Sequence, residues 1–211
     1  MSLTWQIKQK IKKLFRKNDL SKYGHISPTA LLPEDIIIYS PSNLFMYEHT
    51  SIQYGAVIMN WRAKFIMKKY SGAAFGLKVI SGNHMRIKGK WFKEITDADK
   101  DILDTHQEYD KDIIVDEDVW IGSNVTLLNG AHVGRGCNIG SGSVIRGSVP
   151  PYSIVVGNPC KVVGFVFTPD EIIEHEQKLY SLEERLPIEL LNKNYNKYFL
   201  DRIADIKEYM K

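Results

Sequence analysis

A histidine follows a short apolar stretch, in a position where it could transfer protons. His84 closes the sequence Ser81-Gly82-Asn83-His84, and a long polar segment follows directly. A histidine between a strand and such a loop can present its imidazole to a cleft, where the ring accepts a proton at neutral pH. Since the chain has five other histidines, a plain surface histidine is the alternative. His84 is a candidate general base.

Trp120 is a second candidate, for ligand binding. It lies in the sequence Asp118-Val119-Trp120-Ile121-Gly122, among small and aliphatic residues. An exposed indole on a coil edge would offer a flat surface to an aromatic or pantetheine-like ligand. The alternative is packing against the neighbouring loop.

Glycine-rich backbone near basic side chains is a third candidate. Residues 140–143 read GSGS, Arg146 follows closely, and Lys161 ends the sequence GNPCK at 157–161. Sparsely covered backbone N–H groups and basic side chains together can bind phosphate. The GSGS stretch weighs little alone, because a tightly coiled fold needs small residues there anyway.

The elements that must position these residues repeat every six residues. From Val115 to Pro150 the chain divides into six consecutive hexads. A period of six fits neither the 3.6-residue helix nor simple strand alternation, so it indicates a solenoid of short strands with tight corners. The first residue of each hexad should point into the core and the small fifth residue should pack below the corner. The first positions hold Val115, Ile121, Leu127, Val133, Ile139 and Ile145; the fifth hold Val119, Val125, Ala131, Cys137, Ser143 and Val149.

The same period continues less regularly upstream. Ile26, Leu32, Ile38 and Leu44 are spaced by six, as are Ile52 and Ile58. We therefore expect 24–84 and 111–166 to form one stacked β-helix, interrupted by a loop at 85–110. A long loop inside a compact repeat domain is usually functional or disordered. Because this one begins immediately after His84, a functional role is favoured.

Helices are expected at both ends. Residues 1–20 form a basic amphipathic helix in this interpretation, which most simply caps the solenoid; contact with a membrane surface or partial disorder are the alternatives. The β-helix domain then covers 21–166, and helices cover 167–211. Thr168-Pro169-Asp170-Glu171 is a strong helix start. Pro187 should separate this helix from a single later one.

Composition excludes several classes. The 211 residues carry a net charge of +3, which does not indicate nucleic-acid binding. The two cysteines lie outside any CxxC pair, so neither a disulfide framework nor a zinc ribbon is predicted. This low cysteine content fits a reducing cytoplasm, where we expect the protein. No apolar run approaches the roughly 20 residues of a membrane span. The basic start lacks the apolar segment of a signal peptide.

Five stretches make the sequence resemble the hexapeptide-repeat acyltransferases, in particular the galactoside, maltose, xenobiotic and capsular-polysaccharide O-acetyltransferases. These are SGNH (81–84), DVWIG (118–122), IGSGSVI (139–145), VPPYSIVVGNPCKVV (149–163) and FTPDEIIEHE (167–176). Residues 1–80 match only loosely. The resemblance implies an all-β solenoid, the left-handed parallel β-helix, assembled as a homotrimer with acetyl-CoA between neighbouring subunits. Residues 85–110 then match the arm that reaches the next protomer.

The resemblance also implies roles for individual residues. His84 matches the family's catalytic histidine. The positions that match the acetyl-CoA site are Trp120, Gly122, Ser123, Ser141, Arg146 and Lys161, the last near the CoA phosphates. A backbone N–H of Gly122 or Ser123 is expected to stabilise the oxyanion. Glu48, Tyr54 and Asn60 are our candidates for the acceptor pocket, although they do not align securely.

The predicted reaction is acetyl transfer to a hydroxyl of a sugar or polysaccharide precursor, without an acyl-enzyme. A small xenobiotic alcohol is the second acceptor. A metalloenzyme similar to γ-carbonic anhydrases is disfavoured, because His84, His106 and His132 are far apart in sequence and no histidines form a close pair; no metal is expected. A non-catalytic β-helix scaffold remains the alternative from another class, and it would not bind acetyl-CoA.

Overall fold

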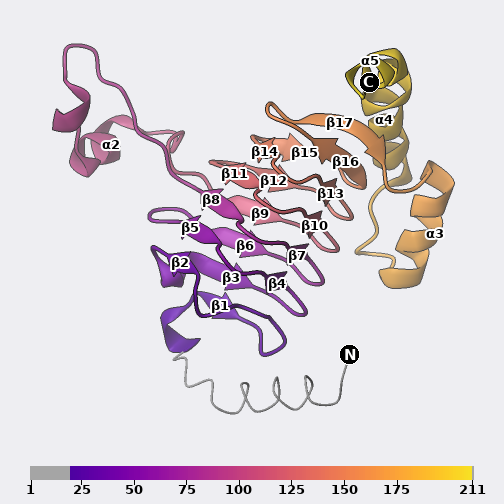
Figure 1. Cartoon of the computed structure of the whole chain (residues 1–211), viewed down its shortest axis with the longest axis horizontal. Helices are drawn as coiled ribbons and strands as arrows, with labels where there is room; N and C mark the ends of the chain where they lie inside the picture. Colours follow the sequence, from indigo (N-terminus) through magenta and orange to yellow (C-terminus); the bar gives the residue numbers. More distant parts are fainter. Residues whose placement is uncertain (1–19, 211) are drawn as a thin grey trace.

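Short strands in three sheets form the body of the computed structural model, which describes residues 20–210 (Figure 1). Sheet A contains β1 (His25–Ile26), β3 (Leu44–Met46), β6 (Phe65–Met67), β9 (Ile113–Val115), β12 (His132–Val133) and β15 (Ser148–Val149). Sheet B contains β4 (Ser51–Ile52), β7 (Gly72–Ala73), β10 (Trp120–Ile121), β13 (Asn138–Ile139), β16 (Ser153–Val156) and β17 (Lys161–Phe165). Sheet C contains β2 (Ile37–Ile38), β5 (Val57–Met59), β8 (Lys78–Ile80), β11 (Thr126–Leu128) and β14 (Val144–Ile145).

Successive strands from β2 to β16 pass from sheet to sheet, so each coil contributes one strand to every sheet. The strands of adjacent coils pair in parallel, and among the strands of residues 20–210 only β17 runs antiparallel, against β16. Together with the hexapeptide pattern, these parallel sheets fit the predicted left-handed β-helix. The chain turns at three edges, which we name A-to-B, B-to-C and C-to-A after the sheets they join; examples are residues 116–119, 122–125 and 129–131.

The hexad pattern correctly predicts the core. All six first-position side chains are at most 1% exposed, and the fifth-position side chains, Cys137 among them, are at most 6% exposed. Upstream, Leu32, Leu44, Ile52 and Ile58 are buried as predicted, whereas Ile26 and Ile38 are only half-buried. Burial at the first position follows from strand alternation, because the neighbouring residue must point outward.

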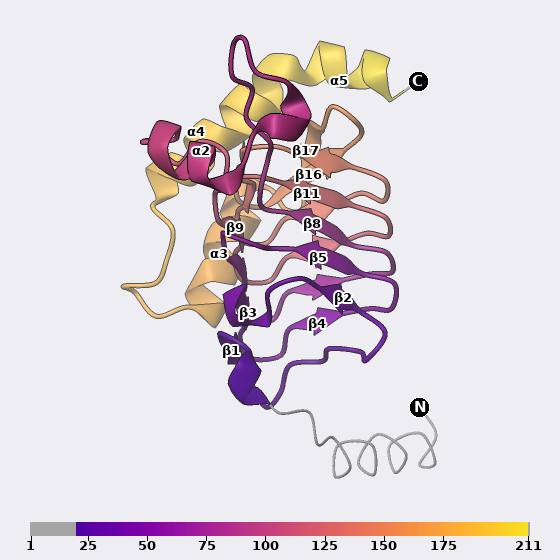
Figure 2. The same ribbon diagram turned by 90° about the vertical axis from the view of Figure 1, so that its left-hand side faces the viewer.

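The segment between β8 and β9 leaves the stack at the C-to-A edge (Figures 1 and 2). It carries a 3-10 turn, η3 (Phe92–Glu94), and the helix α2 (Asp97–Leu103), which begins at a Thr96 capping box. Asp110 holds the base of this inserted segment in place, because it forms ion pairs with Lys100 at 2.9 Å and with Arg62 of the preceding coil at 3.1 Å. The stack itself is not interrupted, because β6 on one side of the insertion pairs with β9 on the other.

Helices follow the last coil: α3 (Pro169–Leu179), α4 (Ile188–Tyr198), the 3-10 turn η4 (Leu200–Arg202) and α5 (Ile203–Tyr209). The helix start at Thr168 is confirmed, with a capping box to Glu171. The prediction of one helix after Pro187 is wrong, because Phe199 leaves the helical conformation and separates α4 from α5. Two further 3-10 turns, η1 (Leu20–Lys22) and η2 (Pro41–Asn43), lie near the start.

A buried ionic network attaches α3 to the β-helix. The Glu176 carboxylate, 2% exposed, accepts hydrogen bonds from Arg135 at 2.9 Å, from the Tyr152 hydroxyl and from the Leu186 N–H at 3.0 Å. Arg135 also lies over the Tyr180 ring at 3.8 Å. The predicted N-terminal helix falls almost entirely outside the described residues. Within 20–210, no helix is both long and apolar enough to cross a bilayer.

Candidate active site

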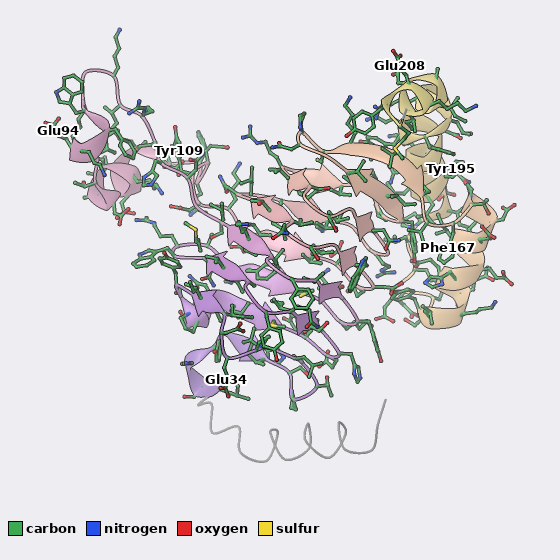
Figure 3. All side chains as sticks on the ribbon, in the orientation of Figure 1. Glu34, Glu94, Tyr109, Phe167, Tyr195 and Glu208 are labelled. Carbon is green, nitrogen blue, oxygen red and sulfur yellow. The ribbon has the colours of Figure 1, made fainter. Side chains whose placement is uncertain are left out.

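His84 lies on the C-to-A edge, where the chain leaves β8 for the arm. The stem of the arm holds it there: Gly82 bridges Asp110, and the Asn83 N–H donates to the Tyr109 carbonyl at 2.6 Å. The His84 side chain is exposed, and its ring meets the Phe92 ring edge to face at 5.1 Å. Its imidazole is therefore supported from the arm and accessible to a hydroxyl substrate. Figure 3 labels Tyr109 in this stem and Glu94 further out on the arm.

Trp120 lies on the outer face of sheet B, and not on a coil edge as the sequence suggested. Its indole is 53% exposed and stands directly above Gly72, where a Cβ would lie 3.5 Å from the ring. It borders a hollow of about 420 Å³ whose other walls include Tyr70, Asp118 and Phe167. Aromatic rings and a carboxylate around one hollow can bind a ring that carries hydroxyl groups.

Gly122, Ser123 and Ser141 meet on the B-to-C edge. The Gly122 N–H donates to the Ile139 carbonyl at 2.8 Å, and the Ser123 N–H donates to Ser141 Oγ at 3.1 Å. Both N–H groups already have partners within the coil, so neither is free in this conformation to stabilise an oxyanion. A Cβ on Gly122 would lie 2.7 Å from the Ser141 nitrogen, so glycine allows the two coils to approach.

Lys161 continues the same edge one coil further. It pairs with Val156 at the carboxyl end of β16, and the Gly157 N–H beside it donates to Ser143 Oγ at 3.0 Å. The Lys161 ammonium lies 4.5 Å from the centre of the Tyr209 ring of α5. Below it, Gly142 faces open space, since a Cβ at this position would meet nothing within 4 Å. The edge is therefore open alongside Ser141 and basic at its end.

Arg146 is separated from these donor-side residues. It follows β14 and lies on the C-to-A edge, two coils above His84. The structure therefore does not bring Arg146 together with Ser141.

The three acceptor candidates lie on three different edges. Glu48 is exposed on the A-to-B edge, and Tyr54 is exposed on the B-to-C edge, where it stacks with Phe75 at 6.5 Å. Asn60 lies on the C-to-A edge but is 0% exposed, and both ends of its amide bond the Ser40 backbone, at 3.0 and 2.8 Å. Its side chain thus offers no surface to a ligand. The structure does not assemble these residues into one pocket.

His84 and the donor-side serines lie at opposite ends of sheet C. His84 follows the carboxyl end of β8, whereas Ser123 and Ser141 precede the amino ends of β11 and β14. Because these strands are parallel, their carboxyl ends share one edge and their amino ends share the other. The candidate residues therefore lie in two separate groups on each chain, one at each end of sheet C.

The structure adds residues that the sequence did not indicate. Phe92 supports the His84 ring, and Tyr70 and Phe167 line the hollow beside Trp120. Each belongs to a part of the chain without a regular hexad, so no periodic pattern marks it.

Titratable groups elsewhere bear on the chemistry. Burial raises the pKa of the Cys137 thiol to about 12, so this sulfur stays protonated and cannot act as a nucleophile at neutral pH. Its predicted packing role agrees with this environment. Among residues 20–210, no three His, Cys, Asp or Glu side chains are grouped so that they could hold a metal ion.

Comparisons with known proteins identify related sequences. Residues 112–147 match the family model for the bacterial transferase hexapeptide, described as six repeats. A "Probable macrolide acetyltransferase" of Lysinibacillus sphaericus is 34% identical over 127 residues, which cover 55% of this chain and 67% of that protein. A protein described as a probable acetyltransferase of Mycobacterium tuberculosis is 56% identical over 46 residues, but these cover 22% of this chain and only 15% of its own length. The chain therefore spans only a small part of that second relative.

Solved structures share the fold. A hexapeptide-repeat-containing acetyltransferase of Vibrio cholerae, complexed with acetyl coenzyme A, superimposes with a TM-score of 0.57 at 19% identity. The match covers 70% of this chain and 74% of that chain.

Proposed function

Because the chain belongs to the hexapeptide-repeat O-acetyltransferase family, we propose that it transfers the acetyl group of acetyl-CoA to a hydroxyl group, with His84 as the general base. The left-handed winding of the coils is part of this proposal. The observation that carries it is the division of the site into two half-sites, an exposed imidazole on one edge and an open, basic edge on the other.

Two copies of the chain would complete one site. Sheet C presents exposed apolar side chains to the outside, including Ile37 at 57% and Met59 at 40% exposure. If three copies turn this face toward a common axis, the C-to-A edge of each copy meets the B-to-C edge of the next. A homotrimer of this kind places His84 of one copy beside Ser123 and Ser141 of its neighbour.

The residues on the B-to-C edge fit the donor. Acetyl-CoA supplies a thioester-activated acetyl group on a long flexible arm. The open space at Gly142 leaves room for the passage of that arm, and Trp120, on the adjoining outer face of sheet B, offers a flat apolar surface near its end. Lys161, at the upper end, is suited to the phosphates.

In the proposed reaction, His84 accepts the proton of the acceptor hydroxyl while the hydroxyl oxygen bonds to the acetyl carbon. The carbon–sulfur bond then breaks, and His84 returns the proton to the departing thiolate. A positioned general base contributes roughly 10²–10⁴-fold to the rate. Phe92 keeps the ring in place by its edge-to-face contact. The reaction needs no acyl-enzyme.

We propose a hydroxyl of a sugar or polysaccharide precursor as the acceptor. The likeness to a maltose O-acetyltransferase and a galactoside acetyltransferase supports this class of acceptor. A xenobiotic alcohol is the second candidate, favoured by the similarity to the macrolide acetyltransferase. The proposed site of action is the cytoplasm, where acetyl-CoA is available.

The test is release of free CoA thiol with acetyl-CoA and a panel of acceptors, mono- and oligosaccharides beside macrolides and chloramphenicol. His84→Ala should lower the rate on the best acceptor by roughly 10²–10⁴-fold. His25→Ala, which changes an exposed histidine on sheet A, is the matched control and should keep the rate. An unchanged rate in His84→Ala would remove His84 from the mechanism, and absence of saturable acetyl-CoA binding would favour the scaffold.

A further inference from the structure

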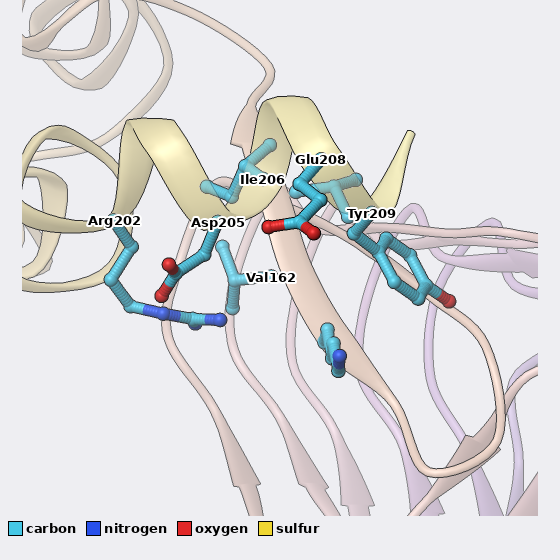
Figure 4. A pocket seen from close by; sticks show the side chains of 8 residues that line it. Val162, Arg202, Asp205, Ile206, Glu208 and Tyr209 are labelled. Atoms are coloured by element: carbon cyan, nitrogen blue, oxygen red, sulfur yellow. The ribbon is translucent and has the colours of Figure 1, made fainter. Parts of the chain in front are cut away.

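The helix α5 crosses the end of the β-helix (Figure 2). A second hollow, of about 290 Å³, lies beneath it (Figure 4). Its floor is β17, with Lys161 and Val162, and its roof is α5 with the residue before it, Arg202. Figure 4 shows Arg202 and Tyr209 descending from the same side of the helix, at opposite ends of the hollow.

The hollow lies at the upper end of the B-to-C edge, which connects it with Ser123 and Ser141. Adjacent strands of a sheet are about 4.8 Å apart, and Lys161 on β17 is three strands from β10, so it lies about 14 Å above the coil of Ser123. Extended chain spans about 3.4 Å for every three bonds, so the roughly thirteen bonds from the thioester sulfur of acetyl-CoA to its first phosphorus cover about 15 Å. A donor whose thioester lies beside Ser123 therefore extends beyond the last coil, to the level of α5.

The chemistry of the walls fits a nucleotide better than a simple anion. Lys161 and Arg202 supply positive charge for phosphate groups, and Tyr209, 42% exposed, supplies a ring for stacking on a base. Asp205 and Glu208 lie on the same wall. These carboxylates repel a bare phosphate, but they can accept hydrogen bonds from an exocyclic amine or from ribose hydroxyls.

The local backbone is built to bring Tyr209 here. Gly157 has a φ of +95°, in the region that favours glycine, and a Cβ at this position would collide with the Tyr209 hydroxyl. Glycine therefore allows α5 to settle against the end of the B-to-C edge, with the Lys161 ammonium 4.5 Å from the centre of the Tyr209 ring.

We propose that α5 forms the nucleotide end of the donor site, with Tyr209 stacking on the adenine and Arg202 acting with Lys161 on the phosphates. This inference rests on the proposed function, because it assumes that acetyl-CoA lies along the B-to-C edge. It gives the C-terminal helix a role in binding besides covering the end of the solenoid.

The experiment measures binding of CoA, 3′-dephospho-CoA and pantetheine to the full chain by titration calorimetry. Tyr209→Ala and Arg202→Gln should each weaken CoA binding roughly tenfold and leave pantetheine binding unchanged. Tyr209→Phe keeps the ring and should bind CoA like the parent chain. Lys207→Ala, which removes a basic residue of α5 outside the hollow, is the charge control.

The outcomes separate the two proposals. If the parent chain binds CoA but Tyr209→Ala and Arg202→Gln bind it equally well, the role of α5 is refuted and the proposed function stands. If pantetheine binding falls as much as CoA binding in these variants, the effect is a general disturbance of the site and the inference fails. If the parent chain binds no CoA, the proposed function fails and this inference fails with it.

Discussion

Activity should be recovered when two differently disabled chains assemble together. The first variant, His84→Ala, loses the base on the C-to-A edge. The second, Ser141→Trp, places a large ring on the exposed donor side of the B-to-C edge and should obstruct the pantetheine arm. Each variant alone should have a very low rate, since every site in its trimer carries the same defect.

The size of the recovery follows from the topology. Each proposed site takes one C-to-A edge and one B-to-C edge from two different copies. In a random equal mixture each edge is intact with a probability of one half, so about a quarter of the sites have both intact edges. Co-expressed variants should therefore regain about a quarter of the parent rate per site, less any loss from unequal mixing.

The assay is CoA thiol release by the co-purified mixture, with each variant purified alone and the two mixed after assembly as controls. Two tags, one on each variant, select the mixed trimers. In these, one of the three sites has both intact edges, so the selected fraction should regain about a third of the parent rate per site. A co-expressed mixture no more active than the average of the two variants would refute the reasoning. That result would mean that His84 and Ser141 of one chain serve the same site.

Three further predictions concern single side chains. Glu176→Leu removes one of the two carboxylates that pair with the Arg135 guanidinium, the other being Glu117, and leaves the buried Tyr152 hydroxyl without its acceptor. It should lower the free energy of unfolding by about 3 kcal/mol in urea titrations. Glu174→Gln on the solvent side of α3 should change it by less than about 0.5 kcal/mol; equal effects would contradict the assignment. The hydrogen bond to Asp116 raises the pKa of His132 above that of an unfolded histidine. The pair therefore stabilises the fold fully below about pH 6.5, and this stabilisation is lost as the pH rises through the pKa of His132 in the folded state. Since His132 is partly exposed, the parent chain should lose about 0.5 kcal/mol or less between pH 6 and 8, and His132→Gln should not show this loss. Cys137→Ala should keep kcat while costing about 1 kcal/mol of stability, and a large fall in kcat without unfolding would reopen a thiol mechanism.

The repeat by itself determined the fold and the core of this protein. A period of six places an aliphatic side chain inside at every strand, and this holds from Val115 to Ile145 because burial depends only on the alternation within each short strand. The helix start at Thr168 was equally local, since a capping box involves only four residues. The position of His84 before a long insertion was also evident from the chain.

Only the tertiary structure decided which residues share a surface. Ser123 and Ser141 are eighteen residues apart, which is one coil, so the repeat itself places them on the same edge. The insertion after His84 interrupts the repeat, so the edge that carries this histidine follows only from the pairing of β6 with β9. The burial of Asn60, the bonded N–H groups of Gly122 and Ser123, and the contact of Tyr209 with the last coil all depend on neighbours far away in sequence. A hexad specifies which side chains point into the core and which point to solvent. The stacking of whole coils determines which edges and helices come into contact.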